Sequence, residues 1–190
     1  MNSVDTRTRI LEAAVSCVEH EGLAKTSLED VATEAGVSRA TVYRYFSGGR
    51  EQLVTETIAW EVANYLQRLA EAVATESGLE AKLVRGLVVG HRTIHEHRLL
   101  QRILRTEPEE FLAEFQPTMP LMGQLVQAEL VVQLTGERLR PGIDPDEAAH
   151  YLAHLFLSYL GNAGRWDLTD DDAVRRLVRT QFLAGVVEPA

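Results

Sequence analysis

The segment ATEAGVSRATVYRYF, residues 32–46, decides how the N-terminal part of the chain folds. Gly36 is of a residue type that commonly follows a helix end, and Ser38 can cap a helix that runs from Arg39 to about Phe46. Two short helices joined by a tight turn that contains glycine form a helix-turn-helix. The segment therefore predicts this motif.

The stretch TSLEDVA, residues 26–32, predicts the start of the first of these two helices. Thr26 followed three residues later by Glu29 is typical of a capping box, and the helix that it opens is expected to run to about Ala35. An earlier helix, which ends at Gly22, brings the number of helices expected in residues 1–48 to three.

The last of the three helices has two chemically different sides. Val42 and Phe46 are four residues apart and face inward with Val37. The opposite side carries Arg39, Ala40, Thr41, Tyr43 and Arg44. Arginine can pair with guanine O6 and N7, a small alanine can touch a thymine methyl, and a tyrosine hydroxyl can reach a phosphate. The alternative is an ordinary solvent-exposed polar face, but the order of turn, cap and face favours DNA binding.

The charge distribution places a phosphate-facing surface in the same part of the chain. The net charge of the 190 residues is -9, which argues against binding of nucleic acid over the whole surface. Residues 1–50 hold six basic and seven acidic side chains, whereas the remainder is clearly acidic. Any DNA-binding surface is therefore expected in the first fifty residues.

The rest of the sequence has an apolar period near 3.6 residues, which predicts an all-α protein. Pro117 and Pro120 are expected to break or kink the helix around residues 111–122. Asp144 is expected to cap a helix to about Leu160, and the stretch TDDD, residues 169–172, to cap the last one. No window suggests a membrane span or a secretory signal, so a cytoplasmic protein without a membrane partner is expected.

The segment TSLEDVATEAGVSRATVYRYF, residues 26–46, resembles the N-terminal DNA-binding segment of the tetracycline-repressor (TetR) family. The resemblance implies a ligand-responsive homodimeric transcriptional regulator, most often a repressor, that binds palindromic operator DNA. It implies a DNA-binding domain at residues 1–48 and a helical ligand-binding and dimerisation domain at residues 49–190. The implied DNA-binding residues are Thr26, Ser38, Arg39, Ala40, Thr41, Tyr43, Arg44 and Arg50.

Within that set the resemblance implies distinct roles. Thr26 and Tyr43 would contact phosphates, and Arg39, Ala40, Thr41 and Arg44 would face the groove. Two positions depart from the family pattern. Arg50 lies one residue farther from the closing aromatic than is common, and Glu29 replaces a basic base-reading residue of some members. Glu29 can accept from cytosine N4 or serve in the capping box.

The family layout also implies where an effector and a second copy bind. The expected pocket residues are Trp60, His91, His95, Leu99, Phe111, Phe115, Met119 and Met122. The expected dimer residues are Phe156, Tyr159, Leu160, Leu177 and Phe182. Aromatic and methionine side chains favour a hydrophobic or amphipathic small molecule, although each of these side chains can equally belong to the core.

Two histidine sets raise the question of a metal. His91, His95 and His97 form one set and His150 and His154 the other, and each contains an i, i+4 pair. No carboxylate or cysteine is placed by the sequence to complete such a site, so neither a metal nor another cofactor is expected. No catalytic motif suggests an enzyme. The alternative to a regulator is a non-enzymatic helical protein-interaction module.

Overall fold

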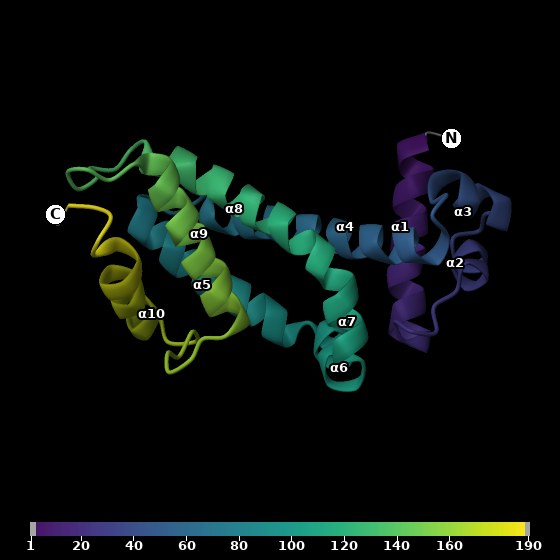
Figure 1. Cartoon of the computed structure of the whole chain (residues 1–190). Coiled ribbons are helices and arrows are strands. Elements are labelled where there is room, and N and C mark those ends of the chain that lie inside the picture. The colour runs from purple at the N-terminus through teal and green to yellow at the C-terminus, as the bar shows by residue number, and fades with distance from the viewer. Residues whose placement is uncertain (1–2, 189–190) are drawn as a thin grey trace. The chain divides into compact units, whose positions relative to one another are not determined.

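The computed structural model describes residues 3–188, with side chains from Thr6 onward, and all the regular elements in that range are helices (Figure 1). They are α1 (Ser3–Glu21), α2 (Leu28–Glu34), α3 (Arg39–Tyr45), α4 (Gly49–Val73), α5 (Leu79–Glu96), α6 (Arg98–Thr106), α7 (Pro108–Phe115), α8 (Met119–Leu134), α9 (Pro145–Gly161) and α10 (Asp171–Leu177). A 3-10 turn spans Gln116–Thr118 and a π turn spans Val178–Leu183. The all-α prediction is confirmed.

Contacts between Cα atoms divide the chain into two compact units. The head unit comprises Met1–Asn64 and His97–Met119, and the second unit comprises Tyr65–Glu96 and Pro120–Ala190. The helix α4 contributes to both units, and α6 and α7 belong to the head unit although they follow α5 in sequence. The predicted domain boundary at residue 48 divides the chain at one point, whereas each unit combines two segments, so the boundary stays a prediction.

The core of the head unit explains why three short helices hold one arrangement. Ile10, Val31, Val42 and Phe46 come from α1, α2, α3 and the residue after α3, and all four side chains are fully buried. Leu53 of α4 joins them. Each such side chain contributes about 1.5–3 kcal/mol by leaving water. The inward orientation predicted for Val42 and Phe46 is confirmed, so the rest of α3 is free to face outward.

The turn between α2 and α3 has the predicted geometry. Gly36 has a φ of +62°, a conformation that residues with a Cβ rarely adopt. The Val37 amide donates to Ala32 O at 3.0 Å and closes the turn. Ser38 Oγ then accepts from the Thr41 amide at 3.1 Å, as an N-cap residue does. The helix-turn-helix is therefore fixed by a glycine and a cap.

The cap of α2 differs from the prediction by one residue. Ser27, not Thr26, is the N-cap, and its Oγ accepts from the Asp30 amide at 3.2 Å. Thr26 is 2% exposed and its Oγ1 donates to Gly22 O at 2.8 Å. The capping box of Thr26 with Glu29 was therefore wrong, because the Thr26 hydroxyl bonds back to the end of α1. The carboxylate of Glu29 is left for another partner.

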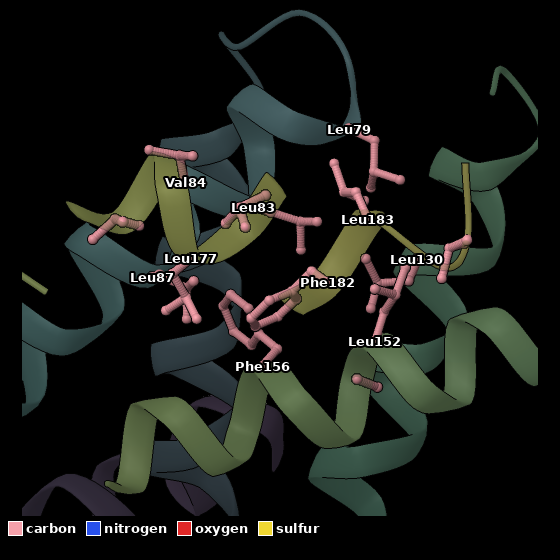
Figure 2. Close-up of a cluster of buried hydrophobic side chains, with 14 of the residues drawn as sticks. Leu79, Leu83, Val84, Leu87, Leu130, Leu152, Phe156, Leu177, Phe182 and Leu183 are labelled. Atoms are coloured by element: carbon pink, nitrogen blue, oxygen red, sulfur yellow. The ribbon is translucent and has the colours of Figure 1, made fainter. Parts of the chain in front are cut away.

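The second unit is built around a larger apolar core (Figure 2). Leu83 and Leu87 of α5, Leu152 and Phe156 of α9, and Phe182 of the π turn meet in this cluster. Asp144 Oδ1 accepts from the amides of residues 146 and 147 and so caps α9 as predicted. The 3-10 turn at Gln116–Thr118 is the expected break. No described helix is long and apolar enough to cross a membrane.

Candidate nucleic-acid interface

The outer side of α3 presents the side chains that the sequence pattern selects. Arg39, Ala40, Tyr43 and Arg44 are exposed, and Thr41 is half-buried. Tyr43 keeps 40% of its surface exposed, whereas Val42 beside it in the sequence is fully buried. The structure therefore brings the five expected side chains of α3 together on one face. Whether they touch DNA stays a prediction.

One end of this face holds two linked hydroxyl groups. Ser38 Oγ lies 2.9 Å from Thr41 Oγ1, so the cap and the first turn of α3 share a hydrogen bond. Ser38 is itself exposed. Hydroxyl groups and the amides of a helix start are common ligands of DNA phosphates. The arrangement can therefore offer neutral donors beside the arginines.

The face also holds a contact network around Arg39. Arg39 Nη2 donates to Tyr43 Oη at 3.4 Å, and the guanidinium carbon lies 5.4 Å from the centre of the Tyr43 ring. Arg39 Nη1 forms a salt bridge with Glu29 Oε1. The hydrogen bond that Arg39 donates to Tyr43 and the charge of Glu29 raise the pKa of Arg39 above its usual value. The guanidinium is therefore held between α2 and its own helix.

Arg50 has a different environment from the one that the resemblance implies. Its Nε donates to Thr26 O at 3.0 Å and its Nη2 donates to Leu23 O at 2.6 Å. Glu114 lies 3.9 Å from Arg50 Nη1. The Arg50 guanidinium thus holds the loop that precedes α2, as the Thr26 hydroxyl does. Donation from the Thr26 hydroxyl to a phosphate requires its bond to Gly22 O to break, whereas the guanidinium of Arg50 has further N–H donors beyond the two bonds to the loop.

Two side chains of the α6 and α7 region also hold the head, which the sequence did not indicate. Arg102 donates to Val18 O and to Glu19 O, both at 2.6 Å, at the C-terminal end of α1. Glu107 Oε2 accepts from the Ala24 amide at 2.7 Å. A Cβ on residue 22 would lie 2.7 Å from the Glu107 carboxylate, so Gly22 permits this approach. Partners 83 or 84 residues apart leave no local pattern that could predict them.

The expected pocket residues are distributed over both units. Trp60, Leu99, Phe111, Phe115 and Met119 belong to the head unit, and His91, His95 and Met122 belong to the second unit. Trp60, Leu99 and Phe111 are half-buried and pack against the apolar clusters of the head. Phe111 and Phe115 stack with ring centres 5.3 Å apart. Met119 is 50% exposed. Several of these side chains therefore serve the core, and their role in a pocket stays a prediction.

The second unit holds two buried polar atoms that lack a hydrogen-bond partner among the described residues. They are Tyr65 Oη and His91 Nδ1. Burial raises the pKa of Tyr65 to about 12. Burial and the neighbouring His95 lower the pKa of His91, while Asp167 acts in the opposite direction. Unpaired buried polar atoms are costly, so these two are candidates for contact with a ligand.

The histidine sets have ordinary partners in the structure. His95 Nδ1 lies 3.0 Å from His91 O, and His97 Nδ1 accepts from the Leu100 amide at 3.1 Å and so caps α6. His150 Nδ1 lies 3.3 Å from Gln127 Oε1. Within the described range, no group of three or more histidine, cysteine, aspartate or glutamate side chains is placed to hold a metal ion.

Four of the five expected dimer residues are in the core of the protomer. Phe156 and Leu160 are 6% and 5% exposed, and Leu177 and Phe182 are fully buried. These side chains pack inside the protomer and leave almost no surface for a second copy, and their assignment to the interface stays a prediction. The same helical period that marks an interface stripe also marks a core stripe. Tyr159 is half-buried, and its ring lies 5.6 Å from that of Phe182.

Known proteins resemble this chain at two levels. The family described as "Bacterial regulatory proteins, tetR family" matches residues 10–57, which include α2 and α3. An HTH-type transcriptional regulator of Mycobacterium tuberculosis (strain ATCC 25618 / H37Rv), Rv0196, is 29% identical over 208 residues, with 96% of each chain covered. The family match is thus confined to the region of the helix-turn-helix, whereas the match to the relative extends along the chain.

Solved structures share the fold at lower sequence identity. The TetR family repressor AlkX from Dietzia sp. has a TM-score of 0.66 at 22% identity and covers 95% of this chain and 98% of its own. FadR from Bacillus subtilis, in complex with stearoyl-CoA, has a TM-score of 0.55 at 17% identity and covers 91% and 97%. At these identities the likeness shows the fold alone. The family match over residues 10–57 and the full-length relative together support a TetR-family transcriptional regulator; members of this family are non-enzymatic DNA-binding proteins and generally ligand-responsive repressors.

Proposed function

We propose that this chain is a homodimeric repressor that binds a palindromic operator through residues 26–46 and is released by a small amphipathic effector. The observation that carries the proposal is the outer side of α3, where Arg39, Tyr43 and Arg44 stand exposed on a helix whose inner side is fully buried. A rigid helix with outward arginines is the form in which a helix-turn-helix enters a major groove.

The proposed DNA contacts are assigned according to which side-chain groups are exposed and which are bonded inside the head. Arg39, Ala40, Thr41 and Arg44 face base edges, and Tyr43 reaches a phosphate. The hydroxyl of Ser38 and the start of α3 face a second phosphate. The side chains of Thr26 and Arg50 are bonded inside the head, so we assign them to holding the loop before α2 in a binding-competent shape.

A second copy is proposed to cover the exposed sides of α9 and α10. Tyr151 is 45% exposed, and its hydroxyl donates to Gln181 O at 2.8 Å, which joins α9 to the π turn that continues α10. His150, His154 and Ser158 extend the exposed stripe of α9 at helical spacing. This exposed face lies beside the buried side chains that the family layout implied.

The proposed effector is amphipathic. A polar group of the effector suits the unpaired Tyr65 Oη and His91 Nδ1 of the second unit. His95 and Met122 are the other proposed effector contacts of that unit. The structural relative FadR was solved with stearoyl-CoA, so long-chain acyl compounds belong in a first effector screen.

Release is proposed to act through α6 and α7. These helices follow α5 directly in the chain, and Arg102 and Glu107 bind the end of α1 and the loop before α2. An effector that prefers a shifted position of this segment would change the position of the head. It can move the equilibrium only by its difference in affinity for the two states.

A selection of random duplex oligonucleotides by the purified protein, at stated salt, tests the proposed function. The wild type is expected to enrich a palindrome, and Tyr43→Ala is expected to lose it. If the wild type enriches no sequence, even after unfolding and refolding to remove bound ligand, the regulator proposal fails. The exposed apolar side chains Leu121, Leu125 and Val132 of α8 would then favour the protein-interaction module.

A further inference from the structure

Glu29 is an acidic side chain beside a surface that has to approach DNA phosphates. It lies in the first turn of α2, where a carboxylate often serves as a helix cap. That role is taken here, because Ser27 caps α2 and its hydroxyl also donates to the Asp30 carboxylate. The side chain of Glu29 is instead exposed and pairs with Arg39 of α3. The pairing with Arg39 therefore gives the Glu29 carboxylate a role besides helix stability.

The pair positions the arginine. Glu29 binds Arg39 Nη1, whereas Tyr43 Oη accepts from Arg39 Nη2 and the Tyr43 ring lies against the guanidinium. Two partners on two different nitrogens restrict the rotation of a long side chain that would otherwise sample many rotamers. An exposed ion pair adds little to stability, so its consequence is orientation.

The chemistry of a carboxylate in the major groove limits what Glu29 can accept. A carboxylate only accepts hydrogen bonds, and it is repelled by phosphates and by the acceptors N7 and O6 of guanine. Cytosine N4 offers a donor and is the base group with which Glu pairs. Arginine in turn pairs with guanine O6 and N7. A linked Glu and Arg from two helices thus suit a site that contains both bases.

We propose that Glu29 is a specificity-determining residue that accepts from cytosine N4 in each half-site and orients Arg39 toward a neighbouring guanine. The proposal rests on the proposed operator binding and deepens it, because it assigns sequence selection to α2 as well as to α3. Glu29 also weakens binding to unrelated DNA, where its charge meets phosphates and no cytosine is placed to compensate.

The test compares Glu29→Gln with Glu34→Gln in the full-length protein at one salt concentration. Both changes remove one negative charge from α2, but Glu34 accepts from Ser16 Oγ of α1 at 2.8 Å and does not contact Arg39. For each variant, the selection of random duplexes is repeated. Affinity is then measured for the wild-type palindrome and for a scrambled duplex of equal length. Circular dichroism and a thermal melt verify that both variants fold.

Glu34→Gln is expected to tighten binding to both duplexes by the same factor and to select the wild-type palindrome. Glu29→Gln is expected to lower the ratio of palindrome to scrambled affinity about tenfold and to lose the preference for cytosine at one position in each half-site. A Gln at this position can pair with adenine, so an adenine preference there would further support the contact.

An unchanged affinity ratio and an unchanged selected sequence in Glu29→Gln would overturn the inference, since Glu29 would then contribute charge alone. A uniform gain equal to that of Glu34→Gln would do the same. The proposed function fails by a different result, the absence of any palindrome selected by the wild type, and the role of Glu29 would fall with it.

Discussion

The outer side of α3 and the apolar cluster of the second unit show two outcomes of similar helical patterns. On α3, the side chains opposite the apolar stripe stay exposed and pair with one another, as Arg39 does with Tyr43. In the second unit, side chains that the family layout assigned to a dimer interface lie in the core, as Phe182 of the π turn does (Figure 2). The polar side of a helix stays exposed once its apolar side is buried. An apolar stripe, in contrast, can be buried either in the core of a protomer or between two protomers.

The strongest test of this difference is Phe182→Ala. A fully buried phenylalanine replaced by alanine is expected to lower the free energy of unfolding by about 3–5 kcal/mol, because transfer energy is lost and a cavity remains. Urea unfolding at a fixed protomer concentration measures it. Tyr151→Ala, on the exposed side of α9, is the comparison and is expected to raise the dimer dissociation constant.

Phe182→Ala would contradict the core assignment if it dissociated a dimer while the unfolding free energy stayed within about 1 kcal/mol of the wild-type value. Size-exclusion chromatography with light scattering, at several concentrations, separates this result from unfolding. Unfolding and dissociation are linked in an obligate dimer, so both measurements use the same protein concentrations.

The exposed side of α3 is tested by Arg39→Ala. Loss of a base-directed arginine is expected to cost about 1–3 kcal/mol of operator binding. Fluorescence anisotropy with the selected palindrome measures this change. Arg68→Ala, an exposed arginine in the part of α4 that belongs to the second unit, is the charge-matched control and is expected to leave the affinity nearly unchanged. Equal losses in both variants would mean that Arg39 contributes only net charge.

The contacts of α6 with the end of α1 are tested by Arg102→Met. Removal of charge-assisted hydrogen bonds to Val18 O and Glu19 O is expected to lower the unfolding free energy by about 1–3 kcal/mol. It is also expected to reduce the response of operator affinity to an effector. Arg105→Met, an exposed side chain on the same helix, is the control. If Arg102→Met kept a wild-type effector response, α6 would not transmit the signal through this residue.

The smallest expected effect concerns pH and His91. Because the pKa of His91 is lowered in the folded protein, the unfolded chain binds more protons just below the ordinary histidine pKa of about 6.5. The stabilisation is present above that pH and is lost as the pH falls through the folded pKa. His91→Asn should therefore reduce the decrease in the urea midpoint between pH 7.5 and pH 5.5. An identical decrease in wild type and variant would mean that His91 does not cause it.

The sequence predicted the parts of the molecule whose causes are local. Gly36, Ser38 and the spacing of Val42 and Phe46 act within a few residues, so the helix-turn-helix and the exposed side of α3 were predictable. The cap of α2 was misplaced by one residue because Thr26 is drawn to Gly22 O by the packing of the loop. Such a competition between two neighbouring hydroxyls is decided by tertiary structure.

The contacts that hold the head were not predictable, because their partners are distant in the chain. Arg102 and Glu107 reach α1 and the loop after it from more than eighty residues away, and nothing in their own surroundings marks them. The pairing of Glu29 with Arg39 is the intermediate case. The sequence indicated a role for each residue separately, but their pairing depends on how α2 packs against α3.

Two copies of this chain are proposed to present α3 to successive major grooves of one operator. Titration of the protein against the selected palindrome, and against a version with 5 extra base pairs at its centre, tests this arrangement. The insertion rotates one half-site relative to the other by about half a helical turn. Affinity for the lengthened duplex is expected to fall to that for a single half-site. Equal affinity for the two duplexes would contradict a dimer that reads both half-sites at once.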